Sequence, residues 1–110
     1  MLTEVVSRAE FDQARQVSSP QKAFLMKHSN ACGISLDVLE DFTRFEAHHN
    51  EAPCFLLTIQ QYRDISALIA KETGVRHESP QVLVFQDGNV VDNYSHYSIT
   101  YDRLVSGLNQ

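Results

Sequence analysis

The residue with the clearest chemical potential in this sequence is Cys32, which stands between a short apolar run and a long amphipathic stretch. The amphipathic pattern predicts a helix that begins at Cys32 or Gly33, because apolar residues then recur every three or four positions. Backbone N–H groups and a partial positive charge gather at a helix N-terminus, and both stabilise a thiolate. A thiolate is the nucleophile of thiol–disulfide exchange. Lys27 and His28, which end the apolar run, can add positive potential; a small buried cysteine is the alternative interpretation.

The second cysteine, Cys54, opens the next predicted strand. Parallel strands joined by a helix start at the same edge of a sheet, so Cys54 is expected about six residues, or roughly 20 Å, from the edge where Cys32 lies. A disulfide requires Cα atoms within about 7 Å, so we interpret Cys54 as a core residue. Ser35 occupies the position at which a Cys-x-x-Cys protein has its second thiol. The sequence therefore predicts a monothiol site, which exchanges with a small-molecule thiol.

A further feature is Ser79-Pro80, at the start of a predicted strand that faces the helix N-terminus. A cis bond here would leave the backbone groups of Ser79 free to pair with an extended substrate. A trans proline that simply begins the strand fits the sequence equally well. His77 precedes this proline and can face Cys32. The five histidines show no metal-ligand spacing with the cysteines, so we expect no metal.

The elements that must position these residues follow from periodicity and turn signals. We expect helices over about 7–16, from 32 or 33 to about 48–50, over a stretch that ends before Gly74, and from Ser98 or Thr100 to about 108. Strands are predicted over 22–27, 54–60, 81–86 and 89–94, with a hairpin turn at Asp87-Gly88. This order predicts an α/β, thioredoxin-like fold, in which helices flank a mixed four-stranded sheet and an extra helix lies at the N-terminus.

Length and composition narrow the class of protein. The chain of 110 residues suits one domain over 1–110, and 43% of its residues are hydrophobic. A net charge of −5 argues against nucleic acid or an anionic membrane as a partner. No apolar run approaches the length that spans a bilayer, and no export signal opens the sequence. With only two cysteines, we expect a cytoplasmic protein rather than a disulfide-built secreted one.

Four segments together resemble the monothiol bacilliredoxins of the bacillithiol system: 27–35 around Cys32, 61–66, 74–81 and 95–100. The resemblance implies that Cys32 removes bacillithiol from protein mixed disulfides, as a thiol–disulfide oxidoreductase. It implies a cis Pro80 and backbone hydrogen bonds from Ser79. Bacillithiol would be the co-substrate, with no tightly bound cofactor, and bacillithiolated proteins would be the partners.

The same resemblance suggests where the small thiol binds. Gly33, Ile34 and Ser35 follow the nucleophile directly. Bacillithiol carries carboxylates and a sugar, so its pocket should offer cations and amide donors. The candidate cations are Lys27, Arg63, His77 and His96.

One residue departs from the family pattern, which usually has proline where this chain has Gly33. Glycine restores an N–H group beside the sulfur but loosens the first turn. The resulting Cys-Gly-Ile-Ser is similar to the Cys-Gly-Phe-Ser of monothiol glutaredoxins, which can hold an iron–sulfur cluster between two subunits. A cluster carrier and a thioredoxin-like adaptor without redox activity are therefore the alternative functions, and the sequence leaves the oligomeric state open.

Overall fold

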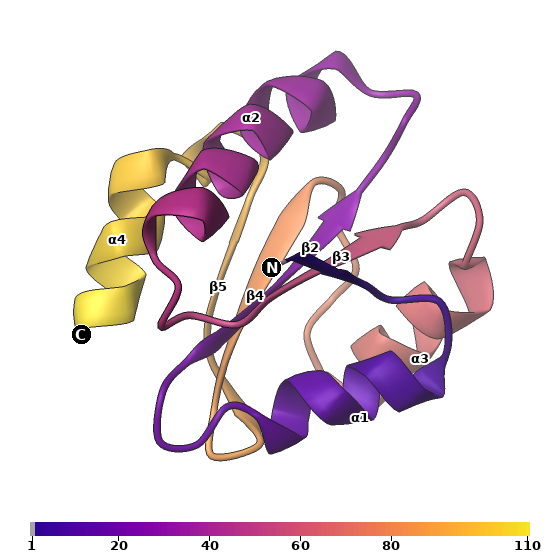
Figure 1. Ribbon diagram of the computed structural model, residues 1–110. Coiled ribbons are helices and arrows are strands. Elements are labelled where there is room, and N and C mark those ends of the chain that lie inside the picture. Colours follow the sequence, from indigo (N-terminus) through magenta and orange to yellow (C-terminus); the bar gives the residue numbers. More distant parts are fainter. Residues whose placement is uncertain (1) are drawn as a thin grey trace.

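A five-stranded sheet lies between two pairs of helices in this computed structural model, which describes residues 2–110. The strand order is β1-β3-β2-β4-β5. Helices α2 and α4 cover one face, and α1 and α3 cover the other (Figure 1). In chain order the elements are β1 Leu2–Glu4, α1 Arg8–Gln16, β2 Ala23–His28, α2 Gly33–His48, β3 Cys54–Thr58, α3 Arg63–Thr73, β4 Gln81–Gln86, β5 Asn89–Ser95, the 3-10 turn η1 His96–Ser98 and α4 Tyr101–Asn109.

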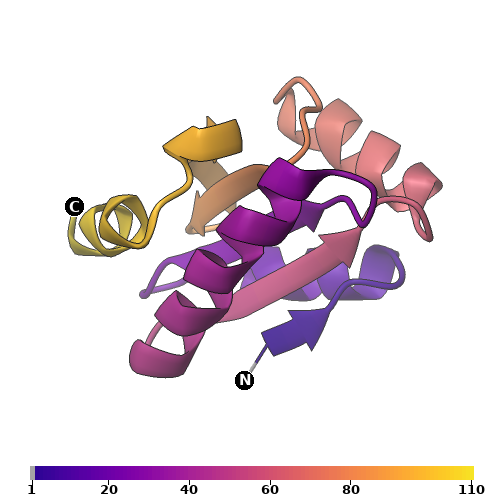
Figure 2. The same cartoon turned by 90° about the horizontal axis from the view of Figure 1, so that it is seen from above.

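The prediction of four strands was wrong by one strand. Strand β1 adds a fifth at the sheet edge, parallel to β3, with Leu2 opposite Cys54 (Figure 2). Three residues are too few to produce a readable alternation, so this segment gave no strand signal. Its place is fixed by Val5, which is fully buried and donates its N–H to the Leu56 carbonyl at 2.8 Å. The thioredoxin-like α/β class and the N-terminal helix are as predicted.

The central strand β2 sets the geometry of the site. It pairs in parallel with β3 and antiparallel with β4, and all six of its residues are buried. Successive side chains alternate between the two faces: Phe24 and Met26 join the core under α2 and α4, and Leu25 joins the core over α1 and α3. By the same alternation, Lys27 belongs to the α3 side and His28 to the α2 side.

Local signals in the sequence explain where the helices and turns begin and end. Ser7 caps α1 and exchanges hydrogen bonds with Glu10 as a capping box. Gly74, at φ +73°, ends α3 in the left-handed conformation that favours glycine. Asp87 and Gly88 form the β4–β5 turn, both at positive φ, and Thr100 caps α4. These four features were predicted from the sequence and are confirmed.

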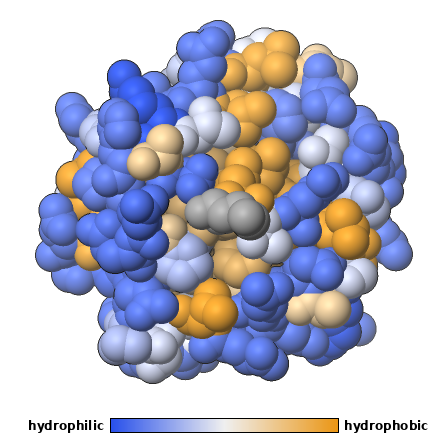
Figure 3. All heavy atoms as spheres, in the orientation of Figure 1, coloured by the Kyte–Doolittle hydropathy of each residue, from blue (hydrophilic) through white to orange (hydrophobic). Residues whose placement is uncertain are grey.

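Among the helices of residues 2–110, none is long and apolar enough to cross a bilayer. In the orientation of Figure 1, apolar side chains gather in a band across the middle of the molecule, bordered by hydrophilic side chains (Figure 3). Smaller apolar patches lie near the edges of the same face, and most of the remaining surface there is hydrophilic (Figure 3).

Candidate functional site

The cysteine at the centre of the candidate site caps a helix, as predicted. Cys32 is the N-cap of α2, with φ −120° and ψ 121°, and it is partly exposed. Its carbonyl accepts the Leu36 N–H at 3.2 Å, which closes the first turn. Gly33 follows as the first helical residue and is exposed, whereas Ile34 is half-buried and packs against the core. The sulfur therefore lies at the positive end of a sixteen-residue helix.

Beneath this turn lies a buried polar cluster that holds the loop rather than facing solvent. Ser35 is fully buried, and its hydroxyl accepts the Ser29 N–H at 2.9 Å. The same hydroxyl lies 2.8 Å from Nδ1 of His28. Burial lowers the pKa of His28, so the neutral imidazole is favoured there. Ser35 and His28 thus act on the loop geometry, and the positive potential expected from His28 is reduced.

The loop after β2 is tied to the loop after β3. Ile59 donates its N–H to the His28 carbonyl at 2.9 Å, and the side chain of Gln60 bonds to both Ser29 Oγ, at 2.7 Å, and the Asn30 N–H, at 3.1 Å. These bonds bring the start of α3 to the same sheet edge as Cys32. The two loops form one surface, which a ligand of Cys32 can touch.

The third loop at this edge contains Pro80. The Ser79–Pro80 bond is cis, which decides the alternative that the sequence left open. Because Gln81 pairs with Lys27, Pro80 lies beside the end of β2, from which the loop to Cys32 leaves. The Pro80 carbonyl accepts the His96 N–H at 3.0 Å. Hydrogen bonding of a substrate by the Ser79 backbone stays a prediction.

The second cysteine lies in the core, as its position in the sequence suggests. Cys54 is 1% exposed, and its thiol contacts the Ala52 carbonyl at 3.4 Å. Burial, aided by the charge of Glu46, raises its pKa to about 12. It pairs with Phe24 at the beginning of β2, whereas Cys32 follows the end of β2. Among residues 2–110, Cys32 is therefore the one exposed thiol.

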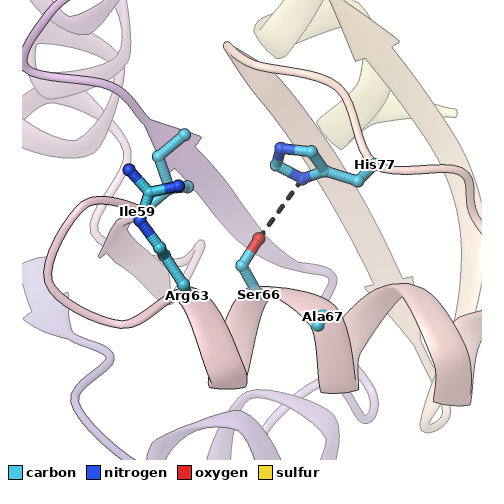
Figure 4. A pocket seen from close by; sticks show the side chains of 5 residues that line it. All are labelled: Ile59, Arg63, Ser66, Ala67 and His77. Atoms are coloured by element: carbon cyan, nitrogen blue, oxygen red, sulfur yellow. Dashed lines mark hydrogen bonds between the residues drawn. The ribbon is translucent and has the colours of Figure 1, made fainter.

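Three of the four predicted cations come together on the α3 side of this edge. Arg63 and His77 line a pocket of about 270 Å³ with Ile59, Ser66 and Ala67 (Figure 4). Lys27, which is fully buried, reaches the edge of this group with its Nζ 3.2 Å from His77 Nδ1. The pocket is therefore lined by an exposed guanidinium and an imidazole, with a buried ammonium behind Ser66 and His77.

His96, the fourth predicted cation, lies elsewhere. Its side chain is exposed and faces Glu78 across 3.9 Å, and its backbone has a φ of +56°. In the part of the chain that the structure describes, no three His, Cys, Asp or Glu residues are grouped so that they could hold a metal ion.

Two residues near the site were not predicted from the sequence. Tyr97, in η1, is 61% exposed and donates its hydroxyl to Asp37 of α2 at 3.2 Å. This hydrogen bond chiefly, with a contribution from the charge of nearby Cys32, raises the pKa of Tyr97. The other is Ser66, whose hydroxyl lies 3.2 Å from His77. Both lie in segments that carry the family resemblance, 61–66 and 95–100, but the sequence assigned a role to neither. Their place at the site is recognised only because the fold brings distant segments together.

Comparison with known proteins supports the thioredoxin-like fold and the family resemblance. The family model of the monothiol bacilliredoxin BrxC matches residues 3–104. A solved structure of thioredoxin fold, to which an oxidoreductase activity has been ascribed, is 33% identical, with 96% of this chain and 92% of that chain covered and a TM-score of 0.86.

Two thioredoxins share the fold at lower identity. The thioredoxin of Malassezia sympodialis is 15% identical, over 100% of this chain and 90% of its own, with a TM-score of 0.77. Mitochondrial thioredoxin 3 of Saccharomyces cerevisiae is 17% identical, over 98% and 93%, with a TM-score of 0.74. Given its matched family, its fold and its single exposed thiol, the chain belongs to the monothiol bacilliredoxins, which act in thiol–disulfide redox chemistry.

Proposed function

We propose that this protein removes bacillithiol from protein mixed disulfides by a monothiol mechanism at Cys32. The observation that carries the proposal is the contrast between the two cysteines. Cys32 is partly exposed at a helix N-terminus. Cys54 is buried at the opposite end of the strands, with its pKa raised to about 12. A protein with one usable thiol cannot close an internal disulfide, so its exchange partner must be another molecule.

The exchange balances as two disulfide displacements. The Cys32 thiolate attacks the bacillithiol sulfur of the mixed disulfide, and a new Cys32–bacillithiol bond forms. The target protein leaves as a thiolate and takes up a proton. A second bacillithiol thiolate then attacks the bacillithiol sulfur on Cys32, which releases bacillithiol disulfide and restores the Cys32 thiolate.

Residues around Cys32 support this chemistry. Cys32 caps α2, so its sulfur lies by the unpaired backbone N–H groups of the first turn, both as nucleophile in the first step and as leaving group in the second. The cis Pro80 loop and the Ser29–Gln60 contact lie at the same ends of the strands as Cys32, and they support a surface on which a protein substrate and the small thiol would lie.

The proposal is tested by intact-protein mass spectrometry after exposure to oxidised bacillithiol, with oxidised glutathione in parallel. We expect one bacillithiol adduct on the wild type and on Cys54→Ala, none on Cys32→Ser, and a smaller fraction of adduct with glutathione. A wild-type protein that takes up neither thiol would overturn the proposal and favour the cluster carrier or the adaptor.

A further inference from the structure

We propose that the pocket between Arg63 and His77 binds a carboxylate group of the small thiol that exchanges at Cys32. This inference rests on the proposed function and specifies how the thiol is recognised. It is carried by the charge, the hydrogen-bond polarity and the size of the pocket, and by its position at the sheet edge that Cys32 shares.

The positive charges at this pocket have no carboxylate in ion-pair contact within the part of the chain that the structure describes. Lys27 is 0% exposed, and its Nζ bonds to the Ser66 carbonyl at 3.1 Å and to His77 Nδ1 at 3.2 Å, both of them neutral partners. A buried ammonium ordinarily has a carboxylate nearby, because an unpaired charge is costly to remove from water. The charge of Glu78 reaches His77, where it opposes the lowering of the pKa, but its carboxylate faces His96 across 3.9 Å. A bound carboxylate would supply a negative charge in direct contact.

The hydrogen bonds around His77 point a donor toward the ligand. A protonated lysine can only donate, so the contact from Lys27 makes Nδ1 of His77 an acceptor. The Ser66 hydroxyl, 3.2 Å from the same nitrogen, can donate to it as well. The proton of the neutral ring is then on Nε2, which is available as a donor to an anion. Burial, together with the charge of Lys27, lowers the pKa of His77 and so favours this neutral form.

Arg63 supplies the second and stronger donor group. Its guanidinium extends from the first residue of α3 along Ile59, on the side of the pocket opposite the His77 ring, with Ser66 between them (Figure 4). Two N–H groups of a guanidinium match the two oxygens of a carboxylate. The volume of about 270 Å³ is below that of most complete ligand sites, so the pocket suits one end of a ligand.

The position of the pocket allows the rest of the ligand to reach the sulfur. Ile59 lines the pocket and bonds through its N–H to the His28 carbonyl, four residues before Cys32. Gln60 bonds to Ser29 and Asn30 in the loop that leads to Cys32. A thiol whose carboxylate lies between Arg63 and His77 would therefore extend across this loop contact toward Cys32.

The test measures binding without exchange. The ligand is S-methyl bacillithiol, which cannot form a disulfide. The comparison ligand is the same molecule with its carboxylates converted to methyl esters. Both are titrated by calorimetry into full-length Cys32→Ser protein and into the same protein with Arg63→Gln added. Lys71→Gln is the matched control, because it removes one positive charge from the exposed last turn of the same helix.

We expect the ester to bind about tenfold to a hundredfold more weakly than the acid when Arg63 is present, as fits the loss of a charge-assisted hydrogen bond. With Arg63→Gln, acid and ester should bind about equally, and Lys71→Gln should leave both affinities unchanged. The His77 imidazole resonances should shift with the acid and not with the ester.

Equal affinity of acid and ester in the presence of Arg63 would overturn the inference, as would the absence of saturable binding. Failure of the proposed function would be seen separately, as a wild-type Cys32 that takes up no bacillithiol from its disulfide.

Discussion

Replacing Lys27 by methionine should remove the pH dependence that this residue gives to the stability of the protein, because a buried charge is lost together with its two hydrogen bonds. Lys27 is fully buried, and burial lowers its pKa from 10.5 to about 8. At 1.36 kcal/mol per pKa unit, this difference corresponds to about 3 kcal/mol of unfavourable free energy for the charged native state. Lys27 contacts Ser66 and His77, which line an open pocket, and solvent screening there would reduce the penalty to about 2 kcal/mol.

The sign of the pH dependence follows from protonation in the two states. Below pH 8 the native and unfolded chains both carry the proton, so the full penalty of burying the charge is present. Between pH 8 and 10.5 the native state releases the proton while the unfolded state keeps it, and the Lys27 contribution to stability rises. The free energy of unfolding of Lys27→Met, relative to that of wild type, should therefore be highest below pH 8 and should fall at higher pH.

Urea denaturation at pH 7 and pH 9.5 measures both effects. The hydrogen bonds to Ser66 and His77 contribute about 1 kcal/mol each and offset the penalty, so we expect Lys27→Met and wild type to differ by less than about 1 kcal/mol at pH 7. Relative to wild type, Lys27→Met should be less stable at pH 9.5 than at pH 7 by at least about 1 kcal/mol. Lys22→Met is a control. Lys22 caps the end of α4 through the carbonyls of Gly107 and Gln110, at 2.9 and 2.6 Å, so its replacement should destabilise the protein.

A stability difference between Lys27→Met and wild type that is the same at both pH values would refute this reasoning. So would a difference that favours Lys27→Met more at pH 9.5 than at pH 7. The predicted change would mean that the wild type buries a charged Lys27 at pH 7 at a cost in free energy, as expected of a residue retained for ligand binding.

Four other substitutions and reactions test the account. Gly33→Pro should raise the free energy of unfolding by about 0.5 to 1 kcal/mol. The added Cβ would meet no atom within 4 Å, and Cys32, at φ −120° and ψ 121°, already has the conformation that precedes proline. An unfolding midpoint below that of wild type would contradict this. Cys54 should resist iodoacetamide at pH 8 in the native protein and react in urea, since its pKa is raised to about 12 by burial; native alkylation at equal rate would contradict its assignment to the core. Ser7→Ala should lose about 1 kcal/mol with the capping box, as measured by thermal unfolding, and an unchanged midpoint would argue against the cap. Gly107→Ala should cost about 1 to 3 kcal/mol in the same assay, because its Cβ would lie 2.5 Å from the hydroxyl of Tyr94; a neutral substitution would show that the ring can move aside.

Much of the site could be predicted because its signals are local. The start of α2 at Cys32 follows from the helical period, the hairpin from Asp87-Gly88, and the core position of Cys54 from the direction of parallel strands. The membership of the family rests on short segments near the site, and the family model confirms it.

The remainder depends on contacts between distant segments. Strand β1 is three residues long and exists because it pairs with β3. The 3-10 turn η1 places the exposed Tyr97 near Cys32, and no sequence pattern predicted this turn. Lys27 was expected to add potential near the sulfur, but the alternation of β2 directs it to α3 and buries it beside His77. Sequence periodicity gives the side of the strand, whereas the fate of a charge on that side is decided by packing.

The most direct test of the central claim is the transfer of bacillithiol from a bacillithiolated protein to Cys32. Equimolar amounts of that protein and of Cys54→Ala are mixed without free bacillithiol, and both masses are followed with time. We predict that the target loses one bacillithiol while this protein gains one, and that Cys32→Ser gains none. A target that keeps its bacillithiol in the presence of an intact Cys32 would contradict the account.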